Sequence, residues 1–296
     1  MLIDDVKSQP VLCPAKINLF LAITGLRSDG YHNLLSWVAP LNWGDRLSIH
    51  QNKSEHTSTL EISGKINLET SPDNLILKAV EVFTEFIPDT PPYHFELEKN
   101  IPIGAGLGGG SSNAATALKL INQERREPVS DKILSGLAAK VGSDCPLFLH
   151  SGPSLLHGRG DLVEALDRKV LSSFEGKKIL LIRPEFEIAT PWAYQRIKKY
   201  DDYQNKKDAE NLLKEFMRNP LPKKFFNQFQ DSLCRKYIGL NVFLKNFKNQ
   251  FTHPIMITGS GSVLFTLLNE SELPSVIDFT EEHWGEEGIL AICEFL

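Results

Sequence analysis

Apolar and polar side chains alternate most clearly near the start of the chain, from Pro14 to Leu21. One face of this stretch carries Ala15, Ile17, Leu19 and Leu21, and the other carries Lys16, Asn18 and Phe20. Because successive side chains of a strand point to opposite faces, the pattern predicts a β-strand. It also predicts that Lys16 and Asn18 lie together on the face opposite the aliphatic one.

Similar patterns predict the other elements, with a turn at Gly25–Gly30 after the first strand. Further strands are expected at Arg46–His50 after a Gly44-Asp45 turn, at Tyr93–Glu98, at Lys178–Ile182, and on both sides of a glycine turn within Ile255–Leu268. Helices are expected at Ser111–Asn122, with Ala114, Ala117, Leu118 and Ile121 inward, and at Ser130–Val141, with Ile133, Leu134, Leu137 and Ala138 inward. Ser111 or Ser112 is the expected N-cap of the first helix, and Lys198–Lys214 is expected to be solvated helix and loop.

The character of the sequence changes after Ser151-Gly152-Pro153. A chain of 296 residues favours two domains. We therefore expect an N-terminal domain over residues 1–155 and a C-terminal domain over residues 156–296. Pro146 disfavours helix at the preceding Cys145, so an abrupt change of direction is expected there.

Composition adds a few limits. Apolar residues make up 42% and charged residues 23% of the chain, as in an ordinary globular protein, and the formal net charge of −5 does not suit nucleic-acid binding. The four cysteines form no CxxC pair, which argues against a zinc site. With no signal-peptide pattern and no apolar run of about 20 residues, we expect a cytoplasmic protein that does not bind membranes, either monomer or homodimer.

A glycine-rich loop is the strongest single feature, with five glycines between Gly104 and Gly110. Glycines let backbone N–H groups approach an anion, and the expected helix behind them directs its positive end toward the same place. A flexible linker is the alternative, but linkers rarely stand between an alternating strand and an alanine-rich helix. The loop is therefore expected to hold phosphate.

Three common nucleotide folds fit this loop poorly. Gly104, Gly106 and Gly109 satisfy G-x-G-x-x-G, but the spacer with Pro102 separates them from the preceding strand, and no strand ending in an acidic residue follows about 20 residues later. The P-loop pattern with its lysine is absent. The H-R-D and D-F-G motifs of protein kinases are absent as well.

The run Pro102-Ile103-Gly104-Ala105-Gly106-Leu107-Gly108-Gly109-Gly110-Ser111-Ser112 instead resembles the phosphate-binding motif of the GHMP kinases, named after galactokinase, homoserine kinase, mevalonate kinase and phosphomevalonate kinase. Pro14-Ala15-Lys16-Ile17-Asn18-Leu19 and Thr258-Gly259-Ser260-Gly261-Ser262 resemble two further motifs, in the expected order. Gly30-Tyr31-His32, Gly142-Ser143-Asp144-Cys145-Pro146 and Thr190-Pro191 are similar to the 4-diphosphocytidyl-2-C-methyl-D-erythritol kinases within this superfamily. Members of that family more often have alanine and valine at positions 143 and 145.

The resemblance implies an α+β, two-domain GHMP kinase fold: an N-terminal domain like domain 2 of ribosomal protein S5 and an α/β C-terminal domain. It implies ATP with Mg²⁺ in a cleft between the domains, and phosphorylation of the 2-hydroxyl of 4-diphosphocytidyl-2-C-methyl-D-erythritol. It also implies Asp144 as the base for the hydroxyl and Lys16 as the charge on the transferring phosphoryl group. Without the family pattern, a solvent-facing lysine and a turn or capping aspartate would be favoured.

Other positions carry over from the family motifs in the same way. The nucleotide side is expected to include Pro102, Gly104, Gly106, Leu107, Gly108, Gly109, Gly110, Ser111 and Ser112, together with Asn74 and Lys99. The substrate side is expected to include Asn18, Tyr31, His32, Thr190, Tyr194, Gly259 and Gly261, with Tyr31, His32 and Tyr194 against the cytosine. Asn74 could equally be a turn residue, His32 a hydrogen-bonded loop histidine and Tyr31 an ordinary aromatic. The metal ligands stay open.

Two rival functions remain at this point. Another GHMP kinase, of the homoserine or mevalonate type, would share the glycine loop, and the Gly30-Tyr31-His32 segment argues against it. A ligand sensor that kept the fold without catalysis is the second rival. Retention of both Lys16 and Asp144 argues against a sensor.

Overall fold

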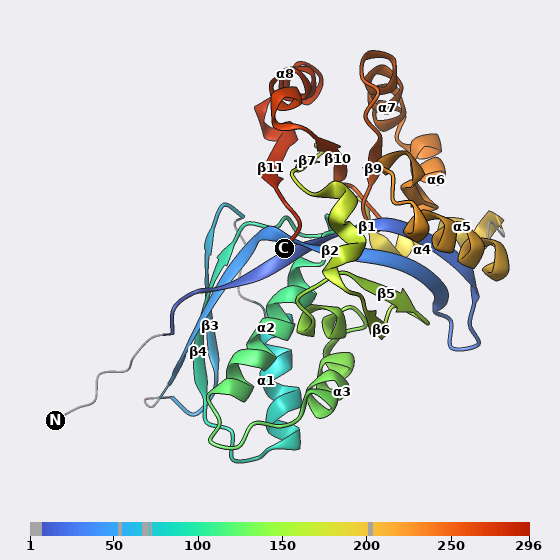
Figure 1. Ribbon diagram of the computed structural model, residues 1–296. Coiled ribbons are helices and arrows are strands. Elements are labelled where there is room, and N and C mark those ends of the chain that lie inside the picture. Colours follow the sequence, from blue (N-terminus) through green and yellow to red (C-terminus); the bar gives the residue numbers. More distant parts are fainter. Residues whose placement is uncertain (1–7, 53–54, 67–70, 72, 201–203) are drawn as a thin grey trace. The chain divides into compact units, whose positions relative to one another are not determined.

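The structure is a computed structural model that describes residues 8–52, 55–66, 71, 73–200 and 204–296, with side chains described up to 197 and from 204 in the last two ranges. Its chain forms two compact units, each built from separate segments (Figure 1). Unit 1 comprises residues 1–15, 43–103 and 108–151, and unit 2 comprises residues 16–42, 104–107 and 152–296. The units are interleaved along the chain. Compactness does not test independent folding, so the division at residue 155 stays a prediction.

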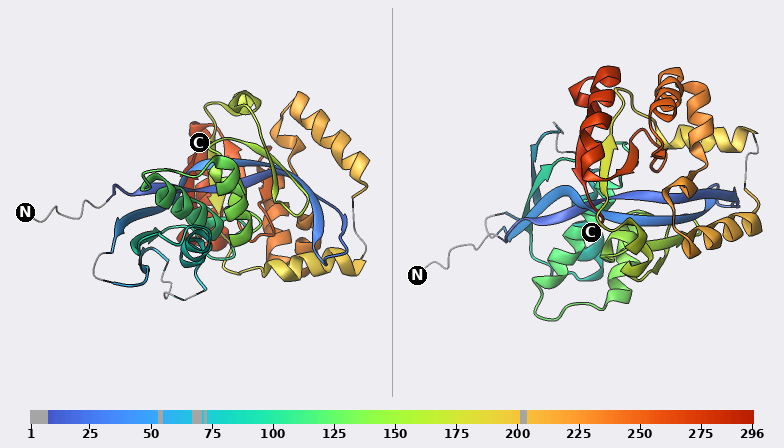
Figure 2. Two further views of the ribbon diagram at one scale, coloured as in Figure 1. Left: turned by 90° about the horizontal axis from the view of Figure 1, so that it is seen from below. Right: turned by 45° about the horizontal axis from the view of Figure 1, so that its top comes forward.

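Two long strands run through both units. They are β1 (Val11–Leu26) and β2 (His32–Gln51), which are neighbours in one sheet and form the long blue ribbons of Figure 2. The alternation between Pro14 and Leu21 correctly predicted β1, although the strand is longer at both ends. β2 begins 14 residues before the expected Arg46, because most of its residues from Leu35 to Leu41 are buried on both faces and show no alternation.

The expected turn at Gly44-Asp45 is wrong, since both residues lie inside β2. A Cβ atom at position 44 would lie 2.0 Å from the Cys13 carbonyl oxygen of β1. The glycine is thus required by the close approach of two backbones and not by a turn. The Asp45 side chain is fully buried beside it.

Unit 1 places three helices against a small sheet. The elements are β3 (Thr59–Gly64), α1 (Leu75–Phe86), β4 (Tyr93–Lys99), α2 (Gly109–Gln123), α3 (Asp131–Val141) and the short 3₁₀ helix η1 (Cys145–Leu149). β4 pairs antiparallel with the second half of β2 and parallel with β3. The core includes Phe83, Phe95, Ala117 and Leu118, which come from both helices and strands. The apolar stripe expected on α2 is therefore confirmed.

Three local expectations in unit 1 are corrected. α2 begins at Gly109, and its N-cap is Gly108 in the left-handed conformation (φ 74°) and neither Ser111 nor Ser112. On α3 the residues Leu134, Leu137 and Ala138 are buried as expected, but Ile133 is exposed. Cys145 lies in η1, since Pro146 is compatible with the first turn of a helix.

Unit 2 contains the part of β1 from Lys16 onward, the part of β2 up to Asn42, and a second, four-stranded sheet. Its further elements are β5 (Ser154–His157), β6 (Leu162–Ala165), η2 (Arg168–Phe174), β7 (Lys178–Ile182), α4 (Thr190–Tyr200), α5 (Lys206–Arg218), η3 (Pro222–Lys224), β8 (Phe226–Asn227), α6 (Phe229–Lys236), α7 (Ile238–Gln250), β9 (Ile255–Ile257), β10 (Leu264–Leu268), η4 (Glu270–Glu272), α8 (Leu273–Trp284), η5 (Glu286–Gly288) and β11 (Ile289–Cys293). The second sheet has the order β11-β7-β10-β9. The expected strand at Lys178–Ile182 and the strand–turn–strand within Ile255–Leu268 are confirmed.

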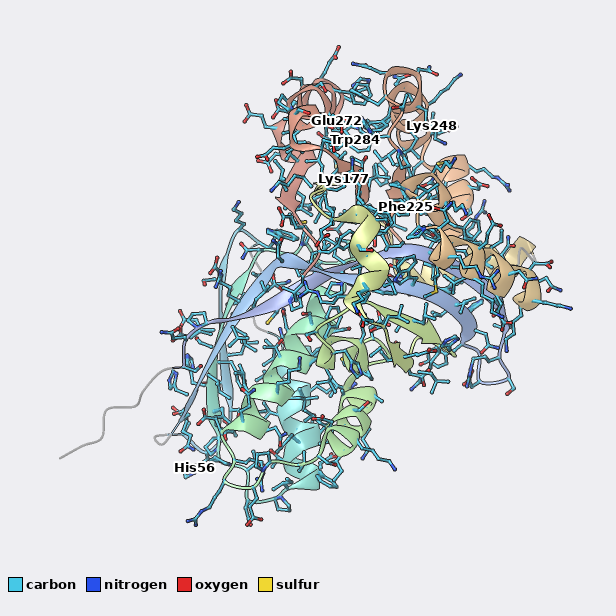
Figure 3. All side chains as sticks on the ribbon, in the orientation of Figure 1. His56, Lys177, Phe225, Lys248, Glu272 and Trp284 are labelled. Carbon is cyan, nitrogen blue, oxygen red and sulfur yellow. The ribbon has the colours of Figure 1, made fainter. Side chains whose placement is uncertain are left out.

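Aromatic packing joins the last helices of unit 2. The Phe243 ring of α7 stacks on the Trp284 ring of α8, with ring centroids 3.8 Å apart, and Trp284 is marked on α8 in Figure 3. Part of the expected polar stretch Lys198–Lys214 falls in α4 and α5, while residues 201–203 lie outside the described residues. None of the helices in the described ranges has the length and apolar character needed to span a bilayer.

Candidate active site

Lys16 lies on β1 in unit 2 and is buried, with 6% of its surface exposed. Its Nζ donates to Oδ1 of Asn18 at 2.6 Å, so the two side chains share one face of the strand as predicted. The Lys16 backbone N–H donates to the Leu107 carbonyl oxygen at 3.0 Å. A solvent-facing lysine is therefore excluded, and Lys16 is tied to the glycine loop through its backbone.

Asn18 connects the first motif to the third. Its Oδ1 accepts from the Gly259 backbone N–H at 2.9 Å, and its own backbone N–H donates to Oγ1 of Thr258 at 3.0 Å. Its Nδ2 donates to Oγ of Ser36 at 2.9 Å, which fixes the orientation of the amide. Residues about 240 positions apart in sequence are thus joined within unit 2.

The first half of the glycine loop, Gly104–Leu107, packs against the same turn of unit 2. A Cβ atom at Gly106 would lie 2.4 Å from the Thr258 carbonyl oxygen, and one at Gly259 would lie 2.8 Å from the Gly106 carbonyl oxygen. Gly106, Gly259 and Gly261 also have positive φ angles, which favour glycine. The three expected motifs therefore meet in unit 2.

The aromatic residues expected against the base also lie in unit 2. The rings of His32 and Tyr194 have centroids 5.1 Å apart, and the edge of Tyr194 contacts Phe229. Tyr31 is 55% exposed and has the Arg159 guanidinium over its ring. The observed pair is therefore His32 with Tyr194, and a base held between Tyr31 and Tyr194 stays a prediction.

Thr190 begins α4 and shares a hydrogen bond of 2.8 Å between its Oγ1 and Oγ of Ser260. Ser260 lies between Gly259 and Gly261 in the turn that Asn18 holds. Thr190 and both glycines thus belong to one hydrogen-bonded group in unit 2.

The second half of the glycine loop, Gly108–Ser112, forms the start of α2 in unit 1. The buried Lys99 lies beneath it, since a Cβ atom at Gly109 would lie 3.1 Å from its Nζ. Lys99 Nζ contacts Oδ2 of Asp45 at 2.5 Å, and Oδ1 of Asp45 accepts from the backbone N–H groups of Asn100 and Ile101, both at 2.7 Å. This buried ion pair fixes the chain where it enters the glycine loop.

Asp144 lies at the N-cap of η1 in unit 1, but its side chain makes no capping hydrogen bond there. This argues against a capping aspartate, but Asp144 does lie in a turn, as the other half of that alternative expects. Burial raises the pKa of the neighbouring Cys145 thiol to about 11, against the opposing effect of a hydrogen bond with Ser111. The Cys145 thiol thus lies against Ser111 in the first turn of α2, and Asp144 is its neighbour in the chain.

Two polar atoms in that first turn are buried without a hydrogen bond to any part of the chain that is described: Oγ of Ser112 and Oδ1 of Asn113. Buried polar atoms are normally satisfied, so a polar ligand suits this position. Together with the backbone N–H groups at the α2 N-terminus, they fit phosphate oxygens and their hard cation.

Asn74 is the N-cap of α1, where its Oδ1 accepts from the Ile76 backbone N–H at 2.9 Å. Its side chain therefore caps a helix, which differs from the turn-residue alternative. The next residue, Leu75, contacts the glycine loop, since a Cβ atom at Gly110 would lie 3.4 Å from Leu75 Cδ1. Asn74 is thus near the loop in unit 1, while its own role toward a nucleotide stays a prediction.

Sequence reasoning missed several residues that organise these groups. They are Asp45, Thr258, Arg159 and Asn227, whose Nδ2 donates to the carbonyl oxygens of Ile257 and Gly259. Thr258 alone could have been found, because it begins a quoted motif. Across the described ranges, no cluster of three or more His, Cys, Asp or Glu residues is arranged to hold a metal ion.

Comparison with known proteins first gives the class. Residues 74–152 match the model of the GHMP kinases N terminal domain. The fold is similar to that of a mevalonate kinase from Methanococcus jannaschii, with a TM-score of 0.70 and 15% identity over the whole of both chains. The protein has the GHMP kinase fold.

More similar proteins narrow the class further. A 4-diphosphocytidyl-2-C-methyl-D-erythritol kinase from Methylacidiphilum infernorum is 36% identical over 88% of this chain and 86% of its own, and one from Francisella philomiragia is 33% identical over 91% and 92%. A solved 4-(cytidine 5′-diphospho)-2C-methyl-D-erythritol kinase has a TM-score of 0.71 at 26% identity, covering 93% of each chain. The chain belongs to the family of 4-diphosphocytidyl-2-C-methyl-D-erythritol kinases.

Proposed function

We propose that this kinase transfers the γ-phosphate of ATP to the 2-hydroxyl of 4-diphosphocytidyl-2-C-methyl-D-erythritol, a step of non-mevalonate isoprenoid precursor synthesis. The observation that carries the proposal is the hydrogen-bonded group around Asn18, in which three distant motifs meet beside Lys16. Such a group has no evident purpose in a sensor that only recognises a base. Relatives of this chain are named for this kinase activity.

The nucleotide side begins with the glycine loop. Backbone N–H groups from Gly104 to Ser112 and the positive end of α2 bind the phosphates of ATP. Lys99 lies beneath the loop at Gly109, and Asn74 precedes Leu75, which lies beside Gly110, so both are assigned to this side. Mg²⁺ is expected with ATP, where it neutralises phosphate oxygens, and the Ser112 hydroxyl and Asn113 amide oxygen suit its coordination.

The chemical step needs a base and a charge. Asp144 takes the proton of the 2-hydroxyl while that oxygen forms its bond to the γ-phosphorus, and the bond to the bridging oxygen of ADP breaks. Lys16 stabilises the charge on the transferring phosphoryl oxygens, and Asn18 holds its ammonium in place. Tyr31, His32 and Tyr194 receive the cytosine, and Thr190, Gly259 and Gly261 shape the acceptor side.

The test is a turnover assay with purified protein, ATP and the cytidine substrate, compared with homoserine and mevalonate. Asp144→Asn should lower kcat by about a hundredfold or more, because a general base contributes that much. Its affinity for ATP should stay unchanged, and the exposed control Asp131→Asn removes the same charge without effect. Preference for homoserine or mevalonate, or turnover by Asp144→Asn near the wild-type rate, would contradict the proposal.

A further inference from the structure

The turn between β5 and β6 is built to hold one side chain in a fixed place. Gly158 and Gly160 on either side of Arg159 have φ angles of 65° and 102°, which other residues rarely adopt. The Gly160 backbone N–H donates to the His157 carbonyl oxygen at 3.0 Å, and the Arg159 backbone N–H donates to Oδ1 of Asp161 at 3.1 Å. The backbone of Arg159 is therefore well defined.

This turn is also attached to the segment that carries Tyr31. The Leu34 backbone N–H, at the start of β2, donates to the Gly158 carbonyl oxygen at 2.7 Å. As a result the Arg159 guanidinium carbon lies 5.3 Å from the centre of the Tyr31 ring, within cation–π distance. Both residues belong to unit 2, and the ring itself is largely exposed.

Arg159 keeps hydrogen-bonding capacity at this position. Its Nε pairs with Oδ2 of Asp161 at 3.2 Å, while its terminal amino groups make no hydrogen bond within the described ranges. Arg27, another arginine of this region, is paired already: its Nε and one terminal nitrogen contact the Asp29 carboxylate at 2.9–3.1 Å, and its other terminal nitrogen donates to Oδ1 of Asn33 at 3.4 Å. Arg159 is thus the guanidinium beside Tyr31 that has donors to offer.

We propose that Arg159 is a substrate-binding residue that holds the diphosphate of the cytidine substrate. A guanidinium presents a planar pair of donors that matches two phosphate oxygens, and its attraction to a diphosphate is charge-assisted. The Tyr31 segment would then bind the base, and the turn between β5 and β6 would bind the phosphates of the same substrate through Arg159. This inference rests on the proposed function, because it takes Tyr31 as the residue that meets the base.

The alternative role for Arg159 is to support the Tyr31 ring without contacting the substrate. The two roles differ in what happens when phosphates are removed from the ligand. A diphosphate-binding arginine increases affinity only for ligands that carry phosphates. A supporting arginine changes the affinity for cytidine and its phosphates by the same factor.

The experiment measures binding of cytidine, CMP and CDP by calorimetry to the wild-type protein and to Arg159→Met, which keeps the side-chain stem. We expect affinity for CDP to fall about tenfold or more, the scale of a lost charge-assisted contact, while affinity for cytidine changes less than about twofold. Arg159→Lys keeps a charge without the planar pair of donors and should give an intermediate loss. The exposed Arg168→Met removes the same charge elsewhere in unit 2 and should bind all three ligands as the wild type does.

Turnover gives an independent measurement. In Arg159→Met the KM for the cytidine substrate should rise, while kcat and the KM for ATP stay within about threefold of wild type, since the lost contact acts in binding alone. Equal loss for cytidine and CDP, or CDP binding at wild-type strength, would overturn the inference. Failure of the proposed function looks different, because the wild-type protein itself would then neither bind CDP nor phosphorylate the cytidine substrate.

Discussion

Two buried lysines, one in each unit, are held in different ways. Lys99 of unit 1 faces the carboxylate of Asp45, whereas Lys16 of unit 2 faces the amide oxygen of Asn18. Each ammonium lies near a glycine, since a Cβ atom would be 3.1 Å from Lys99 Nζ at Gly109 and 3.2 Å from Lys16 Nζ at Gly259. The carboxylate of Asp45 cancels the charge of Lys99, while the amide of Asn18 orients the ammonium of Lys16. The ion pair points to a structural duty for Lys99, and the electrostatic duty of Lys16 is the one proposed above for the transferring phosphoryl group.

The largest effect is expected when the buried ion pair is broken. Lys99→Met leaves the fully buried Asp45 carboxylate without its cation, which should lower the free energy of unfolding by about 3 kcal/mol or more. Urea denaturation measures this loss. The double variant Lys99→Met with Asp45→Asn removes both charges, so it should lose less than the two single variants together. A Lys99→Met protein as stable as wild type would contradict the structural role of Lys99.

The second effect concerns turnover and not stability. Lys16→Met should lower kcat by about a hundredfold, equal to roughly 2.7 kcal/mol in the barrier, because it removes the charge proposed to meet the phosphoryl group. The thermal midpoint of this variant should fall less than that of Lys99→Met. Lys169→Met, at an exposed position of unit 2, serves as the control for loss of a lysine. Wild-type turnover in Lys16→Met would leave that lysine with no more than a packing role.

The smallest effects come from the two glycines. Gly259→Ala places a Cβ 2.8 Å from the Gly106 backbone oxygen at a φ of 56°, so we expect a stability loss of about 2 kcal/mol. Gly109→Ala meets only side chains, Ile101 and Lys99, and should cost about 1 kcal/mol or less after they shift. Thermal melting compares the two variants side by side. A larger loss for Gly109→Ala than for Gly259→Ala would mean that the Gly109 site in unit 1 is packed more tightly than the Gly259 site in unit 2.

Elements with a clear period were the ones that sequence could predict. β7 was predicted to the residue, and β1 and the stripe of α2 followed from alternation and from alanine spacing. The first half of β2 could not be found, since burial on both faces removes alternation and Pro40 and Gly44 read as breaks. α1 was missed as well, because the sequence left Asn74 open between a nucleotide-side residue and a turn residue, while the structure makes it the N-cap of a helix.

The sequence predicted those residues of the site that lie within the quoted motifs. Lys16, Asn18, Gly106 and Gly259 were singled out from sequence, and the structure joins them in unit 2. Asp45 and Arg159 were not, because their importance comes from contacts with residues more than 50 positions away or in another turn. No local pattern records such contacts. The start of α2 was also misplaced, because Gly108 with its positive φ occupies the N-cap position where a serine side chain was expected.

Gly44 shows how the close approach of two backbones can restrict which amino acids one position accepts. Its backbone conformation is open to any residue, yet the Cys13 carbonyl oxygen occupies the place of a Cβ. Every amino-acid replacement at position 44 therefore pushes β1 and β2 apart, whatever the chemistry of the new side chain. In a library of all single variants this position should stand out as intolerant. An inherited change there would act as a defect in folding yield rather than in kinetics.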